Sequence, residues 1–101
     1  MPKKPFEYLT EQMFYILMAL NDGKKCGIEI VEYINAKTRG RVRLGPATLY
    51  TLLSKFEASS MINEVETDGR KRTYEITESG MELYLNEIER LRVCVRDADT
   101  V

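Results

Sequence analysis

One short segment, residues 44–57, constrains the fold more than any other part of the chain. Pro46 suits the first turn of a helix, because its fixed φ favours the helical conformation and its missing N–H would have no partner there. After it, large apolar side chains recur at intervals of three and four residues: Leu49, Leu52, Leu53 and Phe56. This spacing predicts an amphipathic helix from Pro46 to Glu57 with one face in a hydrophobic core.

The opposite face of this helix carries small and hydroxyl-bearing side chains. At about 100° per residue, this face contains Ala47, Thr51 and Ser54, with Tyr50 and Lys55 at its edges. It has no acid and no bulky apolar residue, so it suits close approach to a DNA groove. For the helix taken alone, the alternative to a DNA-binding face is an ordinary solvated face. The neighbouring parts of the sequence distinguish these two interpretations.

Charge is segregated along a chain whose net charge is only −1. Residues 36–55 contain no acid and five basic residues: Lys37, Arg39, Arg41, Arg43 and Lys55. Three further basic residues are consecutive: Arg70, Lys71 and Arg72. Residues 77–101 instead carry a surplus of acids. Segregation of this kind can place a basic, DNA-binding surface on a protein that is nearly neutral overall.

Length and composition exclude several classes of protein. A chain of 101 residues makes one small domain with a marginal core, which favours an oligomer. There is no histidine, and Cys26 and Cys94 have no base to activate them and no metal-binding spacing, so we expect no enzyme, metal site or cofactor. Two unpaired thiols suggest a reducing compartment, and the apolar run 13–20 is too short to span a bilayer. We expect a cytoplasmic protein without a membrane partner.

Two helices are predicted before the helix at Pro46–Glu57. The first, from Thr10 to Asn21, is apolar on nearly every side, so we expect one face to pack on its own core and another on a partner chain. A fully wrapped central helix is the alternative. The second runs from Gly27 to Lys37 and ends at Arg39-Gly40. Alternation of polar and apolar residues from Arg41 to Leu44 then predicts a short strand.

A β-hairpin follows, centred on Asp68-Gly69, a favoured pair for a tight turn. Its strands would be Met61–Thr67 and Arg70–Ile76. A two-residue loop would place Met61 opposite Ile76, Val65 opposite Arg72 and Glu66 opposite Lys71, with Met61, Val65, Tyr74 and Ile76 on the buried face. The cationic tip is either a solvated turn that protects the sheet edge or, beside a helix of this kind, a wing.

The last predicted element is a long helix, from Glu78 to Ala98, capped by Thr77 or Ser79. Its apolar residues follow a heptad pattern: Met81, Tyr84, Ile88, Leu91, Val95 and Ala98. A helix of this length is not stable alone, so it must pack on its own domain or on a second copy, and we favour the second copy. Cys94 lies beside this seam, where we expect a packing residue rather than a redox switch.

The order of these elements predicts a mostly helical α+β fold, a winged helix-turn-helix with an added C-terminal dimerisation helix. Residues 1–76 would form the winged-helix DNA-binding domain and residues 77–101 the dimerisation helix, within one compact unit. In a symmetric dimer two recognition helices lie roughly 34–36 Å apart, one turn of DNA. The expected partners are therefore a second copy of the chain and double-stranded DNA with a palindromic operator.

Several motifs resemble those of the PadR-type winged-helix transcriptional regulators. They are Ile16–Leu20, Cys26–Ile30, GRVRLGPATLYTLLSKFE at Gly40–Glu57, Met61-Ile62 and DGRKRTYEITESG at Asp68–Gly80. The resemblance implies a dimer formed by the first and last helices and a repressor of transcription. It also implies a response to small aromatic or amphipathic ligands, and the short C-terminus is similar to that of the compact subfamily.

The DNA contacts combine the resemblance with the residue pattern. The resemblance assigns contacts to Thr48, Tyr50 and Lys55 and to the wing residues Arg70, Lys71 and Arg72, and the pattern adds Thr51, Ser54, Arg41 and Arg43. Long side chains that read bases are scarce on the outer face of the recognition helix. We therefore expect sequence specificity to rest on thymine methyl groups, DNA shape and the wing.

The dimer surface is assigned to the first and last helices. Its predicted residues are Phe14, Leu17, Met81, Tyr84, Ile88, Leu91 and Val95. A ligand pocket, if present, should lie between these helices, and a plain dimer core is the alternative. A winged-helix module that binds another protein through the same apolar helices is the alternative function.

Overall fold

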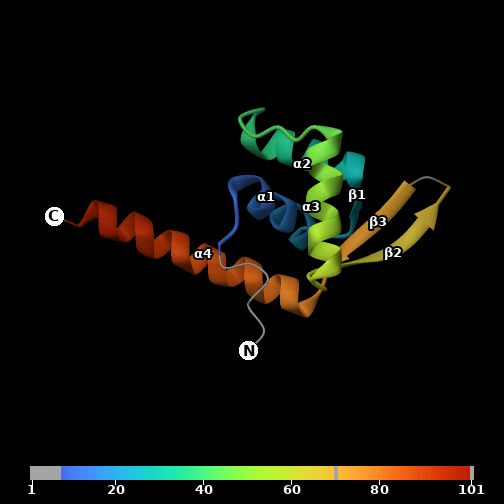
Figure 1. The fold of residues 1–101 in the computed structure, drawn as a ribbon. Helices are drawn as coiled ribbons and strands as arrows, with labels where there is room; N and C mark the ends of the chain where they lie inside the picture. The colour runs from blue at the N-terminus through green and yellow to red at the C-terminus, as the bar shows by residue number, and fades with distance from the viewer. Residues whose placement is uncertain (1–7, 70, 101) are drawn as a thin grey trace.

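The computed structural model describes residues 8–69 and 71–100, and this part of the chain forms four helices and one three-stranded sheet (Figure 1). The elements are α1 (Glu11–Asn21), β1 (Lys25–Cys26), α2 (Gly27–Thr38), α3 (Pro46–Ala58), β2 (Ile62–Asp68), β3 (Lys71–Ile76) and α4 (Glu78–Asp99). The predicted fold class is confirmed: the protein is mostly helical, with a small antiparallel sheet in the order β1-β3-β2. The wing, defined here as β2 and β3, extends from one side of the helices.

Local sequence signals explain where the helices begin and end. The Thr10 hydroxyl accepts a hydrogen bond from the Met13 N–H at 3.2 Å, and the Thr77 hydroxyl accepts one from the Gly80 N–H at 3.0 Å. These two side chains satisfy N–H groups that the first turn of a helix leaves free. At the end of α2, Arg39 and Gly40 both have positive φ, 53° and 77°, as the predicted stop requires.

The strand predicted at residues 41–44 is absent, and this expectation was wrong. The short strand is β1, whose Lys25 and Cys26 pair with Tyr74 and Thr73 of β3. Val42 and Leu44 are nevertheless buried, while the alternating Arg41 and Arg43 are exposed. Alternation fixes which side chains point inward, but a strand also needs a neighbouring strand, and the free edge of β3 is taken by β1.

The hairpin is present, but its predicted register was wrong. Asp68 pairs with Lys71 and Ile62 pairs with Ile76, so the turn comes one residue later than expected. The register shifts between Glu64 and Glu66, and the extra residue, Val65, is exposed. A bulge of this kind leaves one residue unpaired and turns its side chain away from the expected face. Of the predicted inward residues Tyr74 is buried, whereas Met61 and Ile76 are half-buried.

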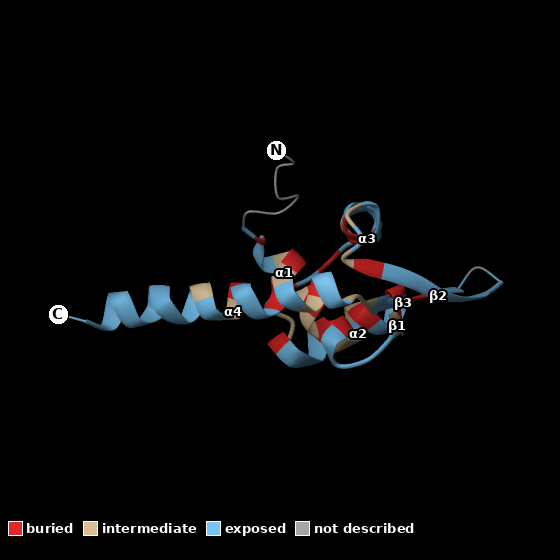
Figure 2. Cartoon of the chain, turned by 90° about the horizontal axis from the view of Figure 1, so that it is seen from below, coloured by how far each residue is buried: buried red, intermediate tan, exposed pale blue. Residues whose placement is uncertain are grey.

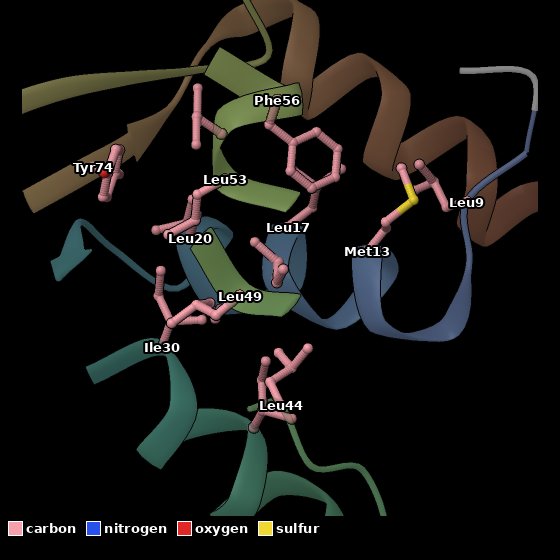
Figure 3. Packing of buried hydrophobic residues seen from close by; sticks show 14 of the residues in the cluster. Leu9, Met13, Leu17, Leu20, Ile30, Leu44, Leu49, Leu53, Phe56 and Tyr74 are labelled. Carbon is pink, nitrogen blue, oxygen red and sulfur yellow. The ribbon is translucent and has the colours of Figure 1, made fainter. Parts of the chain in front are cut away.

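The hydrophobic core is built around α1 (Figure 3). Leu17 and Leu20 of α1 face Leu49, Leu53 and Phe56 of α3. These three residues of α3 are at most 3% exposed, as the predicted apolar stripe requires. Ile30 from α2 and Tyr74 from β3 complete this part of the core. The packing fixes α3 so that its opposite face points outward.

The long helix α4 packs on the domain only through its first half. Tyr84 is buried, and its ring lies 5.4 Å from that of Phe14 in α1. Glu87 is also buried and accepts hydrogen bonds from the Leu9 N–H at 3.1 Å and from the Arg90 guanidinium at 2.7 and 2.9 Å. From residue 91 to residue 100 every side chain is exposed, and this half of the helix projects from the domain (Figure 2).

The junction between the wing and α4 is tightly packed. The Thr77 N–H donates to the Met61 carbonyl at 3.0 Å, and the Thr77 hydroxyl donates to the Ser60 carbonyl at 2.7 Å. Gly80 lies so close to this turn that a Cβ on it would be 2.1 Å from the Met61 carbonyl oxygen. A glycine is therefore needed for α4 to start where it does.

Candidate nucleic-acid interface

The outer face of α3 is exposed along its whole length. Its exposed side chains include Ala47, Thr48, Tyr50, Thr51, Ser54 and Lys55. All five residues that the sequence assigned to DNA from this helix are thus accessible in the described structure. In Figure 1, α3 stands between α1 on one side and the wing on the other. A ligand approaching this face therefore meets the wing at one edge and the segment before α3 at the other.

Tyr50 lies at the edge of this face, against the first turn of α2. It is 51% exposed, and a Cβ placed on Gly27 would be 2.8 Å from the Tyr50 hydroxyl oxygen. The absence of a side chain at Gly27 therefore allows the tyrosine to lie close to α2. Around this contact is a groove of about 370 Å³, lined by Cys26, Gly27, Ile28, Glu29, Tyr50, Lys71 and Arg72. The groove joins α2, α3 and the wing into one continuous surface.

The wing is less basic than its consecutive cations suggest. Lys71 and Arg72 are exposed, while Arg70 lies outside the described residues. Strand β2 contributes three acids beside them: Glu64, Glu66 and Asp68. The Arg72 Nε lies 3.5 Å from the Glu64 carboxylate, and hydrogen bonding to Tyr74, together with Glu64, raises the pKa of Arg72. A count of the cations alone therefore overstates the positive charge of the wing.

Lys24 adds a cation to the wing that sequence reasoning overlooked. Its Nζ lies 2.5 Å from the Glu66 carboxylate, and this contact raises the pKa of Lys24 and lowers that of Glu66. The neighbouring Lys25 instead points inward, where its Nζ donates to the Ala19 carbonyl at 2.7 Å. Lys24 precedes β1 and Lys25 is its first residue. The sequence did not predict this strand, so no sequence signal placed Lys24 next to the wing.

The basic segment before α3 is held by the first turns of α1. The Arg41 guanidinium donates to the Glu11 carboxylate at 3.1 Å and to the Tyr15 hydroxyl at 2.9 Å. These contacts raise the pKa of Arg41. The Gln12 side chain donates to the Arg43 carbonyl at 3.4 Å, and the Arg43 Nε donates to the Gly40 carbonyl at 3.2 Å. Arg41 and Arg43 are both exposed, and Arg41 contacts α1, which Figure 1 shows on the side of α3 opposite the wing.

The residues assigned to a dimer surface separate into two groups. Leu17 is fully buried in its own core, so it has no side-chain surface to offer a partner and its assignment is corrected. Tyr84 is 7% exposed, and its ring lies against that of Phe14. The remaining residues are half-buried or exposed: Phe14, Met81, Ile88, Leu91 and Val95. Four of these, with Arg92, line an apolar groove of about 330 Å³ between α1 and α4.

The fold and the surface together define a winged-helix protein. The family described as the transcriptional regulator PadR-like family matches residues 16–86. The chain belongs to this family, whose members are transcriptional regulators and not enzymes. None of the helices in residues 8–69 and 71–100 combines the length and the apolar character needed to cross a lipid bilayer.

A relative from a transposon has similar sequence. An uncharacterized 37.1 kDa protein in transposon TN4556 of Streptomyces fradiae is 38% identical over 78 residues, which cover 77% of this chain. The matching stretch spans only 22% of that protein. The similarity therefore concerns one part of a longer relative.

Solved structures show the same fold. A transcriptional regulator from Clostridium thermocellum is 26% identical, with a TM-score of 0.77 over 87% of this chain and 86% of that one. Bacillus subtilis PadR, solved in complex with operator DNA, is 21% identical, with a TM-score of 0.66 over 75% of this chain and 45% of that one. At such identity the second comparison establishes the fold alone.

Proposed function

We propose that this protein is a homodimeric, sequence-specific DNA-binding regulator that represses transcription from a palindromic operator. The observation that carries the proposal is the exposed face of α3, rich in small and hydroxyl side chains and flanked by cations on both sides. Such a helix fits a major groove, and the flanking cations suit the phosphates on either side. The structure of Bacillus subtilis PadR with operator DNA supports this use of the fold.

Each group of residues has a separate role in this proposal. Thr48, Thr51 and Ser54 face the bases, where their methyl and hydroxyl groups contact thymine methyls and base edges. Tyr50 and Lys55 bind the backbone at the edges of the groove. The wing residues, including Arg70, and the two arginines before α3 bind phosphates and orient the protein without reading sequence.

The dimer is formed by α1 and by residues 77–101 as the dimerisation helix, whose second half projects from the domain in Figure 2. Leu91 and Val95 lie on the heptad seam and are 37% and 60% exposed. Exposed apolar side chains of this kind are stabilised when a partner buries them. A second copy would cover this seam and the groove beside Phe14. The same groove is the site we assign to a small aromatic or amphipathic effector that releases the protein from DNA.

The proposal is tested by selecting binding sites from randomised duplex DNA and measuring affinity at several salt concentrations. We expect a palindromic site and an affinity that falls steeply with salt. Lys55→Ala should weaken binding, whereas Arg96→Ala, which removes an exposed cation at the far end of α4, should not.

Two outcomes would contradict parts of this function. A strong, isolated requirement for guanine beneath α3 would oppose readout by methyl and hydroxyl contacts. A stable complex with another protein, without any DNA shift, would instead identify a protein-interaction module that uses α1 and α4.

A further inference from the structure

Cations on both sides of α3 are already paired with acids of the same chain. On one side, Arg41 donates to Glu11 of α1 at 3.1 Å. On the wing side, Arg72 lies 3.5 Å from Glu64 of β2. Glu11 and Glu64 belong to different elements and are not part of the DNA-contact set, so these pairs require an explanation of their own.

Both ion pairs lie at the surface and are exchangeable. The exposed fractions of the side chains are 58% for Arg41 and 61% for Glu11, and 61% for Arg72 and 31% for Glu64. Exposed pairs of this kind contribute little to stability and are screened by salt. A phosphate accepts the same charge-assisted hydrogen bonds from a guanidinium as a carboxylate does. An arriving DNA phosphate can therefore replace the carboxylate.

We propose that Glu11 and Glu64 lower the affinity for DNA by occupying Arg41 and Arg72, which exchange carboxylate for phosphate when DNA binds. The inference rests on the proposed DNA-binding function. After the exchange each carboxylate remains next to a DNA phosphate, and the repulsion between like charges adds to the cost of breaking the pair. The acids thus set how tightly the interface holds DNA.

The competing explanation is that the acids orient the arginines for DNA binding, and it predicts the opposite change in DNA affinity. In that case Glu11 and Glu64 would pre-position the guanidinium groups, and their removal would weaken DNA binding. Tyr15 already gives Arg41 a neutral hydrogen-bond acceptor at 2.9 Å, so Arg41 keeps one anchor when Glu11 is replaced. The sign of the change in affinity therefore separates the two explanations.

The experiment uses the full chain and the operator obtained by selection. Dissociation constants are measured for the wild type, Glu11→Gln, Glu64→Gln and the control Glu89→Gln, which removes an exposed acid from α4. We expect the first two variants to bind about three- to tenfold more tightly. Glu89→Gln should stay within about twofold of the wild type, because its charge is remote from the interface. In an Arg41→Ala background the gain from Glu11→Gln should shrink, because no arginine remains to be released.

The measured affinities distinguish failure of this inference from failure of the proposed DNA-binding function. Equal or weaker binding by both glutamine variants overturns the inference, while a wild type that binds no DNA overturns the proposed function itself. Thermal unfolding followed by circular dichroism verifies that each variant is folded. If Glu11→Gln fails to fold because α1 loses the acid in its first turn, Glu64→Gln on the wing decides the question alone.

Discussion

The Tyr50 hydroxyl occupies the space that a side chain at position 27 would need. A Cβ on Gly27 would be 2.8 Å from that oxygen and 3.3 Å from Cζ of the same ring. The contact joins the first turn of α2 to the edge of the recognition helix α3. Because the obstructing atoms are the end of a flexible side chain, a larger residue would move the tyrosine rather than the backbone.

Gly27→Ala should therefore weaken DNA binding with little loss of stability. Displacing the Tyr50 hydroxyl removes one hydrogen bond to the DNA backbone, a loss of about tenfold in affinity. Tyr50→Phe should give a similar loss, and the double variant should be no worse than either single one. Dissociation constants and thermal melts measure the two effects. Additive losses in the double variant would show that Gly27 acts independently of the tyrosine.

Gly80→Ala should instead destabilise the fold. The added Cβ would be 2.1 Å from the Met61 carbonyl oxygen. That oxygen belongs to the backbone and the position of a Cβ is fixed by its own backbone, so the start of α4 must shift. Helix propensity alone favours alanine by about 1 kcal/mol. We expect a net loss of about 1–3 kcal/mol from overpacking. Urea unfolding measures it, with Ser79→Ala at the neighbouring exposed position as the control. Increased stability of Gly80→Ala would show that the junction is loosely packed.

The strength of local signals explains which parts of the fold were predictable. Thr10, Pro46 and Thr77 act on their own helix ends, and the stripe from Leu49 to Phe56 depends only on helical spacing, so these were read from the chain directly. The strand β1 was not predicted, because a strand of two residues is too short to show an alternation of polar and apolar side chains. Its existence depends on pairing with Thr73 and Tyr74, far along the sequence.

The same distinction applies to the candidate interface. The exposed face of α3 follows from the helix alone. The neutralisation of Arg41 by Glu11 involves residues 30 positions apart, and the meeting of Lys24 with Glu66 involves residues 42 positions apart. Glu87 is one of the acids of residues 77–101, and nothing in the local sequence shows that it is buried and accepts the Leu9 N–H.

Glu87 should make stability depend on pH in the acidic range. Hydrogen bonding to Arg90, with a further contribution from the Leu9 N–H, lowers the pKa of Glu87 below its ordinary value of 4.5. A folded-state pKa below the unfolded-state pKa stabilises the protein at every pH above the unfolded-state pKa. This stabilisation is lost as the pH falls through the folded-state pKa. Glu87→Gln should therefore lose stability at pH 7 and show a weaker decline below about pH 4.5. Urea unfolding across this range, with Glu89→Gln as control, measures both effects, and an unchanged acid profile would contradict the role of Glu87.

The projecting half of α4 offers a matched pair of valines for testing the proposed dimer. Val95 is 60% exposed on the heptad seam, and Val93 is 39% exposed on another side of the same helix. Neither is buried within the protomer, so an aspartate at either position should leave the monomer folded. Val95→Asp should dissociate the dimer, because a charge in an apolar seam is desolvated without a partner. Val93→Asp should leave it intact. Sedimentation velocity at several concentrations measures the association. Dissociation by Val93→Asp alone would place the interface on the other side of α4.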